Sequence, residues 1–285
     1  MLFIVFSISV KSQTTEYKTL VDDPDEMKNL SVQLFPAYTA VYMGKEKNGL
    51  EEEATVPVGW AFGIRFSPIP VLNDRLGFNL KYMRSYLEIP EKLDEDKEKI
   101  RNTYFELGGT FNFFSKEKEV SQSLKLSESS NGRTTTIQSL SDVPMTRKTE
   151  IALAAGIFRA KSPIEIGPVK SVVSGLGFYG GLRFTRKINY EAMVSGYGVK
   201  SHGVRNSWYV NALYIPKVNY TTEETRSGDE FDTKHQMDSA GLINNMGLVV
   251  GYELEFNPHK SVSFTVPFEL GVRPPFNGYY IYIGF

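Results

Sequence analysis

The chain has 285 residues and no cysteine, which excludes disulfides, thiolate metal sites and a cysteine nucleophile. Its 32 Lys and Arg residues balance 33 Asp and Glu residues, so the charge does not point to a nucleic-acid-binding protein. No segment approaches the roughly 20 consecutive apolar residues of a membrane helix.

The first twelve residues are typical of a signal peptide. A short apolar run ends at Val10, and Val10 and Ser12 suit cleavage after Ser12. We therefore expect residues 1–12 to be removed on export. The alternative is an N-terminal β-strand, since no Lys or Arg precedes the apolar run. Residues 13–29 are polar, acidic and aperiodic, which predicts a periplasmic N-terminal segment.

From residue 30 onward the hydrophobic pattern has period two, which is typical of β-strands. The clearest examples are residues 55–66 and 261–273, where large apolar residues alternate with Gly, Ser, Thr, Pro and charged residues. The alternation predicts ten strands, near residues 30–43, 55–67, 75–88, 101–114, 146–159, 172–190, 204–220, 240–256, 260–273 and 276–285.

Three features favour an all-β fold in which residues 30–285 form a single antiparallel transmembrane β-barrel with its apolar face turned outward. The strands reach about 10 residues, the length that a tilted membrane-spanning strand needs. Aromatic residues border the apolar faces, as in the interfacial girdles of such barrels: Tyr38, Tyr42, Tyr86, Phe113, Tyr214, Tyr220 and Phe256. The opposite faces mix both signs of charge, which predicts a polar interior. A lipocalin-like soluble barrel is the alternative.

The strand number depends on residues 115–145. As a single periplasmic turn this segment is unusually long, whereas a hairpin of residues 120–127 and 134–140 around Asn131 and Gly132 gives twelve strands. We expect twelve strands, with ten as the alternative. The segment Tyr190 to Gly203 is also long for a periplasmic turn, unless the flanking strands protrude and turn near Gly196.

The last seven residues, YYIYIGF, place four apolar or aromatic residues on one face: Tyr279, Ile281, Ile283 and Phe285. This alternating final strand ending in Phe resembles the assembly signal of Gram-negative outer-membrane β-barrel proteins, and the chain looks most like their Bacteroidota members. The resemblance implies an outer-membrane location. It also implies outer-membrane lipid, lipopolysaccharide and the barrel-assembly machinery as partners.

Two further motifs bear on enzymatic function. Residues 175–180 read GLGFYG and match a dinucleotide-binding fingerprint, but the segment lies inside an alternating strand with no helix to hold a phosphate. His259 and Ser261 resemble the His-x-Ser pair of outer-membrane phospholipases, although they fall in a predicted short turn. Neither motif makes an enzyme the leading expectation.

The sequence predicts a narrow passive channel for small solutes or ions. The expected pore-lining residues are Arg65, Lys81, Glu106, Arg183, Glu253, Glu255, Glu269 and Arg273. A non-conducting outer-membrane scaffold or secretion-system accessory, whose extracellular loops bind a protein partner, is the alternative. A lipid hydrolase that uses His259 and Ser261 is the third possibility. No cofactor or metal is expected.

Overall fold

The computed structural model describes residues 15–24, 30–35, 56–66, 75–89, 103–130, 135–166, 169–225, 244–259, 262–274 and 279–283. These residues form an all-β structure. The strands are β1 (Tyr17–Asp22), β2 (Leu30–Phe35), β3 (Val56–Phe66), β4 (Leu76–Ile89), β5 (Thr103–Ser130), β6 (Thr135–Ile166), β7 (Val169–Val194), β8 (Gly198–Thr225), β9 (Met246–His259), β10 (Val262–Val272) and β11 (Tyr279–Ile283).

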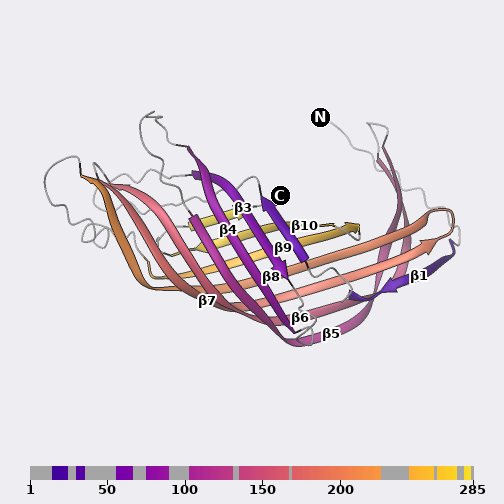
Figure 1. Cartoon of the computed structure of the whole chain (residues 1–285). Helices are drawn as coiled ribbons and strands as arrows, with labels where there is room; N and C mark the ends of the chain where they lie inside the picture. The colour runs from indigo at the N-terminus through magenta and orange to yellow at the C-terminus, as the bar shows by residue number, and fades with distance from the viewer. Residues whose placement is uncertain are drawn as a thin grey trace.

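The strands form one antiparallel sheet in which β2 to β11 follow one another in chain order (Figure 1). The sheet curls strongly, so that Cα atoms of β2 and β10 come within 8 Å of each other. No pairing joins β2 to β11 among the described residues, and the sheet is therefore not closed. No helix long and apolar enough to cross a membrane occurs in the residues described above.

Strands β2 to β11 correspond in order to the ten strands expected from the alternation. Residues 120–127 and 134–140 pair with each other, as the expected hairpin requires, but they are not separate strands because they continue β5 and β6. Pairing between the two strands runs from Thr103 opposite Lys161 to Ser130 opposite Thr135. Among the described residues this hairpin therefore adds no strands to the sheet.

Strands β7 and β8 also extend far beyond their neighbours, as the alternative interpretation of residues 190–203 predicts. They pair up to Val194 opposite Gly198 and turn through Ser195 to Tyr197. Gly196 and Gly198 have positive φ angles of 78° and 71°, a conformation that glycine adopts without steric cost. The backbone N–H of Tyr197 donates to the carbonyl of Val194 at 3.0 Å, which closes the turn.

Strand β1 fills the gap that opens where β6 separates from β7. Pairing between β6 and β7 ends at Arg147 opposite Ile188, and β1 then pairs with residues 190–194 of β7. The Asp22 carboxylate accepts hydrogen bonds from the backbone N–H of Thr146 at 2.7 Å and from its hydroxyl at 2.9 Å. The sequence of residues 13–29 is aperiodic and did not predict this strand, which is ordered by pairing with β7.

The two faces of the sheet differ sharply in polarity. On the outer face large apolar side chains are exposed, among them Leu153 (52%), Phe178 (53%) and Trp208 (54%). The same face carries Leu176, Leu182, Val210, Tyr214, Leu248, Val250, Phe256, Phe268 and Leu270, all exposed. The inner face buries Glu150, Lys187, Arg205, Ser207, Glu253, Glu255, Glu269 and Arg273. This distribution is the reverse of a water-soluble β-sandwich.

The protruding ends of β5 to β8, together with β1, form a compact unit that we call the extension (Figure 1). Its apolar core consists of buried residues from the β5–β6 hairpin and from β7: Leu124, Leu126, Val143, Met145, Tyr190, Ala192 and Val194. Burial raises the pKa of the Tyr190 hydroxyl, which lies 3.0 Å from Thr19 Oγ1 of β1. The hydrogen bond attaches β1 to this core.

Candidate functional site

The inner face holds a network of buried charges centred on Glu269 of β10. One oxygen of Glu269 lies 2.5 Å from Lys81 Nζ of β4 and accepts a hydrogen bond from Tyr209 of β8 at 2.5 Å. The other oxygen pairs with the guanidinium of Arg273, which lies four residues further on, directly after the end of β10. Strands β4 and β10 are six places apart in the sheet, so this contact exists because the sheet curls.

A second carboxylate, Glu106 of β5, is held by neutral donors. Tyr104 donates to it at 2.8 Å and the Asn79 amide at 3.1 Å. The same amide lies 3.2 Å from the Tyr179 hydroxyl. The guanidinium of Arg273 stacks over the Tyr104 ring at 4.2 Å and so connects Glu106 to the Glu269 cluster.

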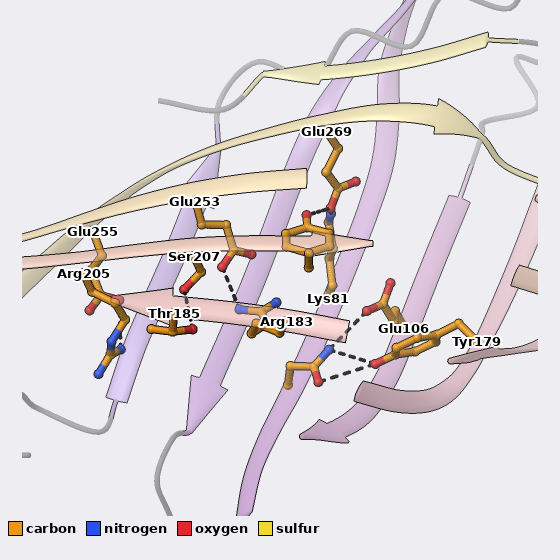
Figure 2. Close-up of polar contacts among 12 residues, drawn as sticks. Lys81, Glu106, Tyr179, Arg183, Thr185, Arg205, Ser207, Glu253, Glu255 and Glu269 are labelled. Carbon is orange, nitrogen blue, oxygen red and sulfur yellow. Dashed lines mark hydrogen bonds and ion pairs between the residues drawn. The ribbon is translucent and has the colours of Figure 1, made fainter. Parts of the chain in front are cut away.

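Further ion pairs lie beside this cluster on the inner face (Figure 2). From Arg183 to Lys187 on β7 they run toward the extension. Arg183 of β7 binds Glu253 of β9 at 2.9 Å, and Arg205 of β8 binds Glu255 of β9 at 3.0 Å. The last pair joins Lys187 and Glu150 at 3.0 Å. Thr185 and Ser207 fill the space between the pairs with a hydroxyl contact of 3.0 Å.

Charge is balanced within this interior network. Its described members comprise five cations (Lys81, Arg183, Lys187, Arg205 and Arg273) and five carboxylates (Glu106, Glu150, Glu253, Glu255 and Glu269). Buried charges of this kind are tolerated only when each one is compensated by a partner and by hydrogen bonds. The described members of the network therefore carry no net formal charge.

Beyond the charges the interior becomes apolar. The inner face of β8 runs from Arg205 and Tyr209 to Leu213 and Ile215. An apolar layer is buried here, with exposed fractions of 0% to 4%: Met83, Phe158, Leu213, Ile215 and Val249. The cavity within the Glu269 cluster has a volume of about 40 Å³, enough for a few water molecules. Among the described residues, the ion pairs and then the apolar layer follow one another along the inner face of the sheet.

Glycines make room for the large rings of the inner face. A Cβ atom added at Gly251 would lie 2.0 Å from Cζ of Tyr209, and one at Gly108 would lie 1.9 Å from the Tyr179 hydroxyl. Tyr209 can lie flat across β9, and Tyr179 across β6 to β5, only because the strands beneath these rings carry glycine.

We expect Gly251→Ala to lower the free energy of unfolding by about 1–3 kcal/mol, because the added methyl group displaces Tyr209 from Glu269. Gly180→Ala is the matched control: its Cβ would meet only the Ala154 carbonyl oxygen, at 3.9 Å, so a change within about 0.5 kcal/mol is expected. Urea unfolding measured by tryptophan fluorescence compares the two variants. Equal stability of the variants would contradict the packing role of Gly251.

The eight residues expected to line a pore have three different outcomes. Lys81, Glu106, Arg183, Glu253, Glu269 and Arg273 converge around one cavity. Glu255 lies on the same face and pairs with Arg205. Arg65 lies on β3 opposite Asn79, and its side chain is outside the described part of the structure.

Several members of the network were not predicted from the sequence. They are Asn79, Tyr104, Glu150, Tyr179, Thr185, Lys187, Arg205, Ser207 and Tyr209. Alternation along the strand could have identified part of this set, because residues an even number of positions apart share a face. Lys187 is four residues beyond Arg183, and Arg205 and Tyr209 lie on the face opposite to the outward-facing Trp208.

The other motifs lie on strands or beyond the described residues. Tyr279, Ile281 and Ile283 belong to β11, which pairs with β10, whereas Phe285 is not described. His259 ends β9 and Ser261 is not described, so the hydrolase pair stays a hypothesis. Residues 175–180 lie within β7, as expected for a strand. Among described residues no group of three or more His, Cys, Asp or Glu is placed to hold a metal ion.

Comparisons with family models, curated proteins and solved structures found no match to this chain.

Proposed function

We propose that this chain is an outer-membrane β-barrel of a Gram-negative bacterium, with strands β2 to β11 as a ten-stranded wall. Its function is to act as a non-conducting anchor that holds the folded extension at the membrane surface. The observation that carries this proposal is the reversed polarity of the sheet, with exposed apolar residues outside and buried ion pairs inside. Lipid outside and a salt-bridged interior account for both faces.

The height of the apolar surface supports a membrane location. On the outer face of β6 the apolar residues lie between Thr149 and Arg159, ten residues apart. At about 3.3 Å per residue and a tilt near 40°, this segment spans roughly 25 Å along the membrane normal. A height of about 25 Å is that of the apolar band of outer-membrane barrels.

The connections between strands support an orientation. At the end that carries the extension the links range from residues 260–261 to residues 67–75. The three longest links, residues 36–55, 90–102 and 226–245, all lie at the opposite end, which also has one short link at residues 167–168. Outer-membrane barrels have short periplasmic turns and long extracellular loops, so the extension belongs on the periplasmic side.

The packing of the described interior side chains favours an anchor over a channel. A passive channel needs a continuous water path, whereas here the Glu269 cluster leaves about 40 Å³ and is followed by the buried layer around Phe158 and Ile215. The residues expected to line a pore act in this proposal as the structural filling of the barrel.

Planar-bilayer recordings test this function. The full chain without residues 1–12, refolded in detergent and added to the bilayer, is expected to give no unitary current steps, whereas a porin added in parallel does. Reproducible steps from the folded chain would replace the anchor by a channel. A heat-modifiable gel shift reports whether the barrel is folded, and a chain that stays monomeric in buffer without detergent would contradict the membrane location altogether.

A further inference from the structure

Four cations gather on the outer face of β5, β6 and β7, immediately beyond the apolar band on the extension side. They are Lys116, Lys118, Arg147 and Arg186, which we call the basic patch. The strand register makes them neighbours: Lys116 is paired with Thr149, which is paired with Arg186, and Lys118 is paired directly with Arg147. Lys116, Lys118 and Arg186 are exposed.

An aromatic row separates the basic patch from the apolar band. The row is made by Phe114 on β5, Phe184 on β7 and Trp208 on β8, where Phe184 and Trp208 are register partners. Phe114 and Trp208 are 45% and 54% exposed. The guanidinium of Arg186 lies 5.0 Å from the centre of the Phe184 ring, so the cations directly adjoin the aromatic side chains.

The basic patch has no compensating acid in the described part of the chain. Glu117 lies between Lys116 and Lys118 in sequence but points to the opposite face, where its carboxylate is 3.6 Å from Lys148 Nζ. Arg147 also has a buried Nε atom with no hydrogen-bond partner among the described residues. In the interior network, in contrast, all the charged residues except Glu106 form ion pairs with one another.

We propose that the basic patch binds the phosphate headgroup of an anionic phospholipid in the periplasmic leaflet. The proposal rests on the proposed function, because it needs the apolar band to lie in a bilayer. A lipid phosphate at the height of Lys116 and Arg186 places its acyl chains alongside Phe114 and Phe184. Two observations select this ligand: four positive charges that form no ion pair within the described ranges, and their direct continuity with an exposed apolar surface.

Lipid selectivity measured by native mass spectrometry tests the site. The full chain without residues 1–12 is refolded into phosphatidylcholine vesicles containing one fifth phosphatidylglycerol and then extracted in mild detergent. Wild-type protein is expected to retain phosphatidylglycerol in excess of its share of the vesicle. The variant K116Q/K118Q/R186Q is expected to lose this enrichment by a factor on the order of ten, because each basic residue near an anionic surface strengthens binding.

The matched control is K18Q/K125Q/K200Q, which removes the same charge from parts of the extension away from the boundary. Its enrichment is expected to equal that of the wild type. Enrichment that survives in K116Q/K118Q/R186Q, or that falls equally in both variants, overturns the site. A further arm adds inorganic phosphate: retention of the lipid supports a headgroup site, and complete displacement means that the patch binds free anions instead.

These results are separable from the proposed function. A heat-modifiable gel shift of each variant shows that the barrel is folded before lipids are counted. If the wild-type chain shows no folded form in detergent, the proposed membrane anchor is contradicted. If the chain is folded but does not enrich phosphatidylglycerol, only the proposed lipid site is contradicted.

Discussion

Replacing Glu269 with alanine is expected to lower the free energy of unfolding by about 3–5 kcal/mol. The carboxylate is shared by Lys81 and Arg273 and also accepts the hydroxyl of Tyr209. In the alanine variant, Lys81 and Arg273 lie close together in the interior without the negative charge that separates them in the wild type. The effect is expected to be large because these side chains are shielded from water, which would otherwise reduce the repulsion.

Urea unfolding of the refolded protein in lipid vesicles measures this effect. Glu128→Ala is the matched control, because Glu128 forms an ion pair with Lys125 on the exposed part of the extension. Such exposed pairs contribute about 0–1 kcal/mol, so the control is expected to unfold close to the wild type. If Glu269→Ala also lowers the free energy of unfolding by less than about 1 kcal/mol, water must screen Lys81 from Arg273, and the Glu269 cluster is not shielded from water.

The two faces of the sheet could be predicted from the sequence because side chains alternate along a strand whatever the strand's partners are. Trp208 and Val210 alternate with Arg205, Ser207 and Tyr209 on β8, and the structure places the two sets on opposite faces. Alternation alone does not say which face is inside. The presence of both signs of charge on one face was the useful signal, since charges can lie inside only in pairs.

The pairings within the interior could not be predicted in the same way. Arg183 and Glu253 lie on strands separated by one strand, but Lys81 and Glu269 lie on strands six places apart. Contact between such distant strands depends on how tightly the sheet curls, and curl is a property of the whole sheet. Neutral donors such as Tyr104 and Asn79 carry no charge pattern that would single them out in the sequence.

The sequence offered the protrusion of β7 and β8 as an alternative, but the continuation of β5 and β6 was not predicted, for a different physical reason. The usual lengths of periplasmic turns favoured dividing residues 115–145 into additional strands. The segment instead continues β5 and β6, with register irregularities near Gln122 and Leu124 and a positive φ of 57° at Asp142. Such bulges bend a hairpin locally without ending its pairing. Strand β1 has no alternation of its own and is ordered by pairing with β7.

Tyr190→Ala is expected to unfold the extension while the barrel stays folded. Tyr190 is fully buried, packs among Leu124, Val143 and Met145, and hydrogen-bonds to Thr19 of β1. Truncating a buried aromatic residue costs about 3–5 kcal/mol, which is comparable to the stability of so small a core. The extension and the interior network have separate cores, so the loss is expected to be local.

Limited proteolysis in lipid vesicles measures this local unfolding. The variant is expected to be cleaved within residues 112–147 at a protease concentration that leaves the wild type intact, and the remaining barrel is expected to keep its heat-modifiable gel shift. Ile137→Ala is the control, because Ile137 lies on the same hairpin but is 58% exposed, so its truncation removes little buried surface. Loss of the gel shift in Tyr190→Ala would show that the extension and the barrel fold as one cooperative unit, because a separately stable barrel would survive the loss of the extension.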